Sequence, residues 1–194
     1  MRIGIDISQI AYGQTGVSNY LENLVRNLIS VDKNNEYVLF FSSLRRNFQF
    51  GSPSGVFNFK SNPNVSIKQF KLPPSLLDLL WNKLHVFPIE NFIGPVDWFI
   101  TSDWTEPPVK SAKKATIIYD LIVYKYPEET HSKTEFNLLR LLISPNIVKT
   151  QKRKHAWVKK ESDVVFTISE SSKKDIVEIL GIDPSKIKII YPSI

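Results

Sequence analysis

Two glycines near the start of the chain occupy a position where backbone amides can approach an anion. Gly13 and Gly16 separate the apolar residues of positions 3–7 from a helical pattern that includes Tyr20 and Leu24. This order predicts a strand, a glycine loop and a helix. Because the first turn of a helix offers free amides and a partial positive charge, the loop is a candidate cradle for a phosphate group.

The glycine spacing does not by itself identify a ligand. Gly13 and Gly16 fit neither the G-x-G-x-x-G pattern of dinucleotide-binding proteins nor the P-loop, which requires a Lys followed by Ser or Thr. The alternative interpretation is that the two glycines only turn a strand into a helix. Both interpretations stay open when the residues alone are considered.

The composition restricts the chemistry that the chain can perform. Its 194 residues are 42% hydrophobic and 23% charged, which is typical of a soluble globular protein. The absence of cysteine excludes disulfides, thiolate metal sites and a cysteine nucleophile. Three scattered histidines, His85, His131 and His155, do not have the spacing of metal ligands. We therefore expect neither a metal ion nor a cofactor.

The positive charge of the chain is concentrated in one segment. The net charge is +6, from 25 basic and 19 acidic residues. Six basic residues between positions 149 and 160 have no acid among them: Lys149, Lys152, Arg153, Lys154, Lys159 and Lys160. Such a run forms either a solvated helix face or a surface that attracts anionic lipid or phosphate. Nucleic acid is the weaker alternative, because it would require strongly salt-dependent binding.

The N-terminus leads directly into a strand, and no stretch of 18 apolar residues follows it. We therefore expect a cytoplasmic protein. If Lys149, Lys152, Arg153 and Lys160 attract an anionic membrane, with Trp157 at the interface, the protein would be peripheral at the inner membrane face.

Strand and helix patterns alternate along the chain. Apolar and β-branched runs predict further strands at 36–43, 65–70, 96–101, 115–119, 163–168 and 186–191. Helices are expected after Ser75, from about Lys133 with a restart at Pro145, and over 170–180 before Gly181. This alternation predicts a Rossmann-like α/β fold with a mostly parallel sheet and helices on both faces. Residues 1–191 are expected to form one domain.

Polar residues gather where the predicted strands end. They occur at positions 8–9, 102–104, 119–120, 169–170 and 191–192. In open parallel sheets the ligand binds outside the carboxyl ends of the strands. The sequence therefore predicts a binding site along this edge.

Four motifs occur in an order and spacing that resemble the N-terminal domain of GT-B glycosyltransferases. They are GVSNY with Asn23-Leu24, IYDL with Tyr126-Pro127-Glu128, DVVFTISESSKKD, and GIDP followed by Ile190-Tyr191-Pro192. The chain is most similar to family 4, a retaining group that includes many mannosyltransferases of cell-surface polysaccharide assembly. The resemblance implies two Rossmann-like domains facing a cleft, with the acceptor mainly on the first domain and the nucleotide-sugar mainly on the second. Residues 192–194 would begin the interdomain linker, and the donor-binding C-terminal domain would be absent.

The resemblance also implies roles for particular residues. Gly16 and Val17 would contact the donor phosphates through their backbone, and no metal is expected to assist them. Asp120 is the candidate for orienting sugar or acceptor hydroxyls, although an Asp here could equally cap the following turn. Tyr119 stands where the family commonly has His. Because tyrosine cannot carry positive charge, it either performs a reduced version of that role or packs as an aromatic strand end.

The remaining candidates lie on the acceptor side: Tyr12, Gln14, Tyr20, Asp103, Trp104, Ser169 and Ser172. Ser169 and Ser172 also occupy a strand-to-helix junction, where serine commonly caps a helix.

Three functional hypotheses follow. The leading one is the acceptor-binding half of a nucleotide-sugar-dependent retaining glycosyltransferase that acts on saccharide or lipid-linked saccharide and is inactive without its C-terminal domain. The others are a stand-alone binding module for a phosphorylated ligand and a nucleic-acid-binding domain.

Overall fold

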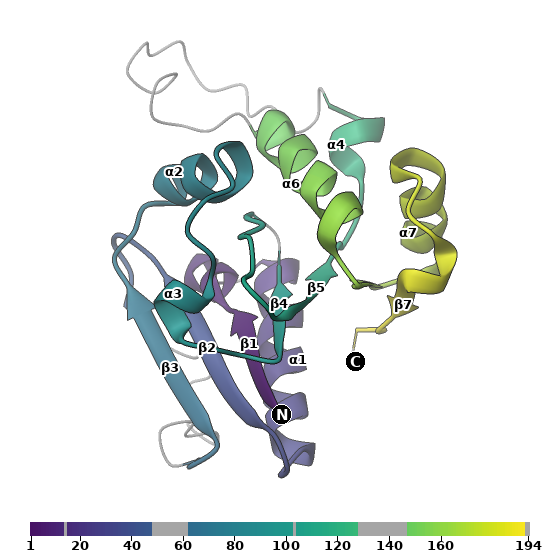
Figure 1. The fold of residues 1–194 in the computed structure, drawn as a ribbon. Helices are drawn as coiled ribbons and strands as arrows, with labels where there is room; N and C mark the ends of the chain where they lie inside the picture. The colour runs from purple at the N-terminus through teal and green to yellow at the C-terminus, as the bar shows by residue number, and fades with distance from the viewer. Residues whose placement is uncertain (14, 48–61, 103, 128–146, 193–194) are drawn as a thin grey trace.

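The structure, a computed structural model, describes residues 1–13, 15–47, 62–102, 104–127 and 147–192. Its strands form one all-parallel sheet in the order β3-β2-β1-β4-β5-β6-β7 (Figure 1). The strands are β1 (Arg2–Asp6), β2 (Glu36–Ser42), β3 (Val65–Phe70), β4 (Trp98–Thr101), β5 (Lys113–Ile117), β6 (Val164–Thr167) and β7 (Ile187–Ile189). The predicted Rossmann-like α/β fold is confirmed.

The longest described helices are α1 (Gly16–Val31) and α6 (Ile147–Glu161). Shorter α-helical segments are α2 (Pro74–Leu77), α3 (Glu90–Ile93), α4 (Ile122–Lys125) and α7 (Glu170–Asp175). Wider π-type turns, η3 (Asp78–Lys83) and η4 (Ile176–Leu180), continue α2 and α7. Tight 3₁₀ turns form η1 (Ser8–Tyr12) and η5 (Pro184–Lys186). Gly181 closes η4 in the left-handed conformation (φ 62°), as the sequence predicts.

Several boundaries differ from the prediction. The helix expected after Ser75 begins at Pro74, because proline suits the first helical position, and no side-chain cap bond forms there. β5 runs two residues ahead of the predicted strand, so that Tyr119 and Asp120 follow its end. The short elements η1, α3 and α4 were not predicted, because four or five residues carry little periodicity. The helix expected from Lys133 lies outside the described residues until Ile147.

The sheet separates two apolar layers. On one face, Ile5, Leu39 and Phe41 pack with Leu21 and Val25 of α1. On the other face, the core is formed by residues from β2, β4, η3 and α3: Val38, Phe40, Phe99, Trp81 and Ile93. Accordingly, α1 lies behind the sheet in Figure 1, whereas α2, α3 and α6 lie in front of it. Over β4 and β6, the side chains Ile100 and Phe166 on the α1 face are only partly buried.

A fully buried ion pair joins neighbouring elements beneath α6. The Glu106 carboxylate accepts hydrogen bonds from the hydroxyls of Thr101 (2.7 Å) and Thr116 (3.0 Å). It also lies 3.1 Å from the Lys114 ammonium, which contacts Glu161 at 3.0 Å on its other side. The buried charges are thus neutralised within one hydrogen-bonded cluster.

A methyl group added at Gly4 should destabilise the centre of the sheet. A Cβ at this position would come within 2.7 Å of side-chain atoms of Ile93 and Phe99. We expect Gly4→Ala to lower the free energy of unfolding by about 1–3 kcal/mol, measured by urea denaturation. The matched control is Gly16→Ala, where nothing lies within 4 Å. An unchanged unfolding midpoint for Gly4→Ala would contradict this packing.

Helix α6 is basic in sequence but buries part of its polar surface. Lys154 is 1% exposed and donates to the carbonyl of Ser102, and His155 is 4% exposed beside the Tyr124 ring. Burial, assisted by the charge of Lys154, lowers the pKa of His155 to about 3. The histidine is therefore neutral in the folded protein under ordinary conditions.

This histidine should make the stability depend on pH. Between pH 3 and 6.5 the unfolded chain binds a proton at His155 that the folded chain does not bind. The free energy of unfolding should therefore rise with pH by up to about 1.4 kcal/mol per unit in this window and level off above it. Urea titrations should show a shallower rise for His155→Phe. Equal pH slopes in the two proteins would rule out this contribution.

Candidate functional site

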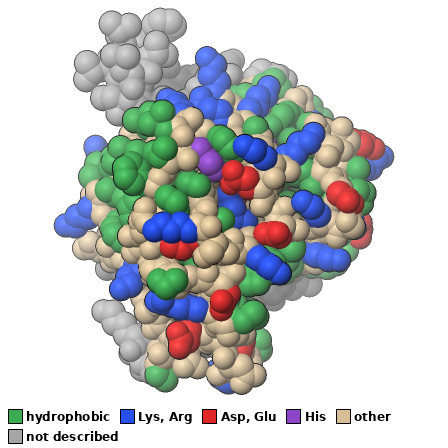
Figure 2. Space-filling view, in the orientation of Figure 1, with side chains coloured by type: hydrophobic (Ala, Val, Ile, Leu, Met, Phe, Trp, Pro, Cys, Tyr) green, Lys and Arg blue, Asp and Glu red, His purple; other side chains and the backbone are tan. Residues whose placement is uncertain are grey.

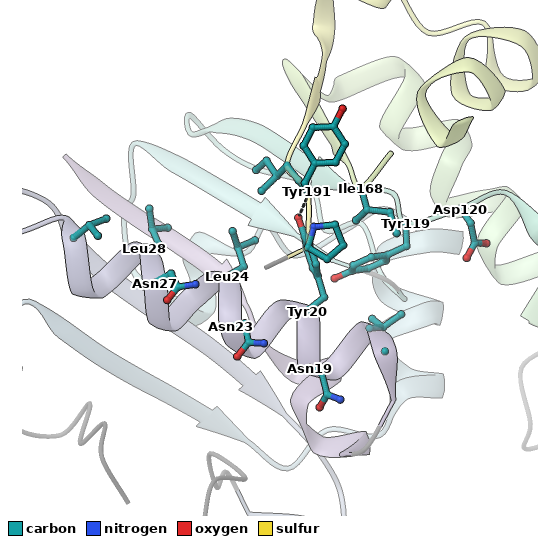
Figure 3. Close-up of a pocket in the computed structure, with 15 residues that line it drawn as sticks. Asn19, Tyr20, Asn23, Leu24, Asn27, Leu28, Tyr119, Asp120, Ile168 and Tyr191 are labelled. Carbon is teal, nitrogen blue, oxygen red and sulfur yellow. Dashed lines mark hydrogen bonds between the residues drawn. The ribbon is translucent and has the colours of Figure 1, made fainter. Parts of the chain in front are cut away.

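A groove of about 690 Å³ runs along α1 beside the ends of β5, β6 and β7 (Figure 3). The inner stripe of α1, including Leu21 and Val25, is fully buried against the sheet. The next stripe around the helix is only partly covered and lines the groove with Val17, Leu24 and Leu28. The groove therefore has an apolar floor, which follows from a helix whose apolar arc is wider than its contact with the sheet.

A row of asparagines borders this apolar floor. Asn19, Asn23 and Asn27 follow one another at intervals of four residues, which places them on one side of α1. All three are exposed, and their carboxamides lie along the edge of the groove in Figure 3. Each carboxamide offers both a donor and an acceptor to a hydroxyl-rich ligand.

Two tyrosines form the centre of the groove. The Tyr20 ring meets the Tyr119 ring edge to face, with centroids 5.5 Å apart. The Tyr20 hydroxyl donates a 2.9 Å hydrogen bond to the carbonyl of Ile190, which joins α1 to the segment after β7 (Figure 3). Partial burial raises the pKa of Tyr20, so that its hydroxyl stays protonated as this bond requires. Contact of Tyr20 with an acceptor remains a prediction.

Tyr119 belongs to the apolar core as well as to the groove wall. It is 7% exposed and packs with the residues that α1 buries. Its carbonyl accepts a 2.9 Å hydrogen bond from the Ser172 hydroxyl. Of the two interpretations of Tyr119, packing as an aromatic strand end describes its position, while a role toward ligand remains a prediction.

Ser169 and Ser172 act together at the start of α7. The Ser169 hydroxyl accepts from the Ser172 backbone amide at 3.1 Å, which is a helix cap, and donates to the Ser172 hydroxyl at 3.0 Å. Neither serine lines the groove. Through the carbonyl of Tyr119, however, this pair fixes the loop that carries Asp120.

Asp120 lies at the mouth of the groove. One carboxylate oxygen accepts the Ile122 amide at 3.0 Å, which is the alternative capping interaction. Its other oxygen has no hydrogen-bond partner among the described residues, and the side chain is exposed. Asp120 thus caps the turn and still has one carboxylate oxygen available to a ligand. The N-terminus of α1 lies at the same end of the groove (Figure 3).

The first turn of α1 provides the amides expected from the glycine loop. Thr15 caps the helix by accepting the Ser18 amide at 3.1 Å. Within the described ranges, the amides of Gly16 and Val17 have no acceptor, and both residues line the groove. Among the described residues, no atom lies within 4 Å of a Cβ added at Gly16, so the space above it is open.

Two of the other predicted residues, Tyr12 and Trp104, do not line the groove. Tyr12 lies in η1 after β1 and is 47% exposed, and Trp104 follows β4 with its carbonyl bonded to Asn82. Gln14 and Asp103 lie outside the described residues. The described part of the predicted set is therefore divided among the groove, the junction between β6 and α7, and the ends of β1 and β4.

Sequence reasoning missed residues both in the groove and at the end of β1. The four-residue spacing of the asparagines could have identified the groove edge, since it is visible in the sequence. At the end of β1, Asp6 is 6% exposed, and burial raises its pKa although Ser8 and the charge of Lys154 oppose the shift. A local sequence pattern does not bring Asp6 and Lys154 together, because Lys154 comes from the distant helix α6.

Comparison with known proteins finds no matching family model and no curated protein with significant similarity. In the described part of the chain, no three His, Cys, Asp or Glu side chains are arranged to hold a metal ion. None of the described helices has the length and apolar content needed to cross a membrane. The function must therefore be inferred from the fold and the groove.

The Tyr20 hydroxyl should stabilise the wall of the groove. Tyr20→Phe keeps the ring contact with Tyr119 but removes the bond to Ile190, so we expect a loss of about 0.5–1.5 kcal/mol in urea unfolding. Faster amide hydrogen exchange at Ile190 and Tyr191 should accompany it. Tyr12→Phe is the matched control, because no hydrogen bond of the Tyr12 hydroxyl is found in the described structure. Equal behaviour of both variants would contradict this role.

Proposed function

We propose that the chain is the acceptor-binding half of a nucleotide-sugar-dependent retaining glycosyltransferase of the GT-B, family 4 type, a class of enzymes that transfer hexosyl groups such as mannosyl. The observation that carries the proposal is the groove, where the free amides of α1 and the Tyr119-Asp120 loop lie at one end. The all-parallel sheet agrees with this architecture, and one end of the groove lies at the carboxyl edge, where such sheets bind ligands.

Each group at the mouth of the groove has a role in this proposal. Glycosyl transfer requires a held acceptor hydroxyl and stabilisation of the departing diphosphate. The amides of Gly16 and Val17, at the positive end of a 16-residue helix, suit a phosphate oxygen. The available oxygen of Asp120 suits a hydroxyl donor on the sugar or the acceptor.

The remainder of the groove suits the body of a saccharide. Sugar rings present apolar faces and hydroxyl edges, and the groove presents Tyr20 and Leu24 beside Asn19 and Asn23. Tyr119 provides an aromatic surface and a hydroxyl but no positive charge. The charge of the departing diphosphate would therefore be compensated by the helix N-terminus.

A second candidate function is a binding module for a phosphorylated ligand. The open space above Gly16 and the free amides beside it favour this candidate, since they require only an anion. It differs from the first candidate in its dependence on Asp120, because a carboxylate repels an anionic ligand.

Amide chemical shifts can separate these functions. The chain should be titrated with methyl mannoside, mannobiose, GDP-mannose and inorganic phosphate while its ¹H–¹⁵N spectrum is recorded. The proposal predicts that mannosides shift the amides of Gly16, Asn19 and Asp120. Asp120→Ala should weaken mannoside binding by roughly tenfold, the usual cost of losing a hydrogen bond to a charged group.

Asp183 offers a matched control. It caps a turn in the same way, accepting the Ser185 amide at 2.8 Å, but does not line the groove. Asp183→Ala should therefore leave mannoside binding unchanged. If only phosphate and GDP-mannose shift these amides, and Asp120→Ala does not weaken the binding of either ligand, the second function is favoured. If no saccharide shifts the groove at millimolar concentration, the first is overturned.

A further inference from the structure

Large apolar side chains are exposed on a turn that follows η3, on the face of the sheet opposite to α1. Leu84 is 58% exposed, Phe87 56% and Val86 39%, and Leu79 of η3 beside them is 40% exposed. We call these four residues the apolar turn. Figure 2 shows apolar side chains gathered over α2 and η3, with basic side chains close by.

The backbone of this turn is held firmly in an unfavourable conformation. His85 (φ 53°) and Phe87 (φ 59°) are both in the left-handed region, which costs each of them of order 1 kcal/mol. The Trp81 indole donates to the carbonyl of Phe87 at 3.0 Å, and the Val86 amide donates to Leu80 at 2.9 Å. These bonds compensate for the strain and hold the apolar side chains outward.

The ring of His85 fixes the same turn from α6. It stacks on Trp157, with centroids 3.6 Å apart and planes 8° apart. Its two nitrogens lie 2.8 Å from the carbonyl of Trp81 and 3.0 Å from the Glu161 carboxylate. The apolar turn and α6 therefore form one rigid surface.

The same contacts hold Trp157 in place. It is half-buried between His85 and Lys160, and its indole donates to the carbonyl of Asn82 at 3.0 Å. Lys154 is buried, and Arg153 forms an ion pair with Asp78 at 3.0 Å. The cationic run is thus smaller at the surface than the sequence indicates.

Two exposed cations border the apolar turn. The Lys160 ammonium lies 4.8 Å from the centre of the Trp157 ring, and the Lys83 side chain is 49% exposed. The neighbouring acids also have partners beneath the surface: Asp78 pairs with Arg153 at 3.0 Å as well as with Lys83 at 3.9 Å, and Glu161 pairs with Lys114 and His85. This combination of protruding apolar side chains and exposed lysines matches the chemistry of an anionic bilayer surface.

We propose that the apolar turn and the flanking Lys83 and Lys160 form a docking surface for anionic lipid bilayers. The side chains of Leu84, Val86 and Phe87 enter the interfacial region, and the two lysines contact lipid phosphates. The groove lies on the other side of the sheet, along α1. Docking therefore leaves the groove accessible, and the inference goes beyond the proposed function without depending on it.

Flotation with lipid vesicles tests the apolar part. Vesicles of phosphatidylcholine with phosphatidylglycerol should bind the chain, and vesicles of phosphatidylcholine alone should bind it much less. The double variant Leu84→Gln/Phe87→Asn should bind at least about tenfold more weakly, because the apolar area that leaves water is lost. Asparagine tolerates the left-handed conformation of position 87, so the variant should remain folded. Leu44→Gln, at another leucine of similar exposure (53%), should bind like the original chain.

The charged part is tested by Lys83→Ser/Lys160→Ser, which should weaken binding to anionic vesicles by roughly 25-fold, about fivefold for each lysine. Lys33→Ser/Lys188→Ser removes the same charge from other exposed positions and should have a smaller effect. Equal recovery with both vesicle types, or unchanged binding by Leu84→Gln/Phe87→Asn, overturns the proposal. If the original chain binds no vesicle, the proposal also fails, and the apolar turn is then assigned to a protein partner.

Discussion

The arrangement of β4, β5 and α6 depends on one buried interaction, the Glu106–Lys114 ion pair. Both side chains are fully buried, and the cost of removing two charges from water is recovered only when every partner is in place. Those partners come from β4 (Thr101), β5 (Thr116) and the end of α6 (Glu161). Asn82 connects η3 to the same cluster, because its side-chain oxygen accepts a 3.0 Å hydrogen bond from the Glu106 amide. The position of α6 over the strands, and with it the rigid surface around His85, therefore follows from one electrostatic requirement.

The two faces of the sheet serve different purposes as a result. On one face, α1 covers β1 and β2 but leaves part of its own apolar arc uncovered, which creates the groove. On the other face, α6 and η3 are locked together by His85 and Trp157 and present lysines and apolar side chains outward. Because the sheet lies between them, a ligand in the groove and a surface bound to η3 do not compete for space.

Local patterns were sufficient to predict most of the fold. The apolar run of β2 and the apolar arc of α1 identified these elements, and Gly181 identified the end of η4. The same arc placed Gly16 and Tyr20 near the groove, because a helix brings residues three or four apart to one side. The burial of Lys154 and Asp6 was not predictable in this way. It depends on α6 lying over the ends of β1 and β4, which only the assembled sheet determines.

β1 lies inside the sheet, between β2 and β4, and this position has a consequence for folding during synthesis. Its pairing with β2 involves nearby sequence, but its other neighbour is β4, and the Arg2 amide bonds to Asp97 across 95 residues. On the ribosome, β1, β2 and β3 therefore emerge well before β4 can join them. During that interval the nascent chain exposes one bare hydrogen-bonding edge of β1, which makes this the stage most open to chaperone binding or to misassembly with other chains.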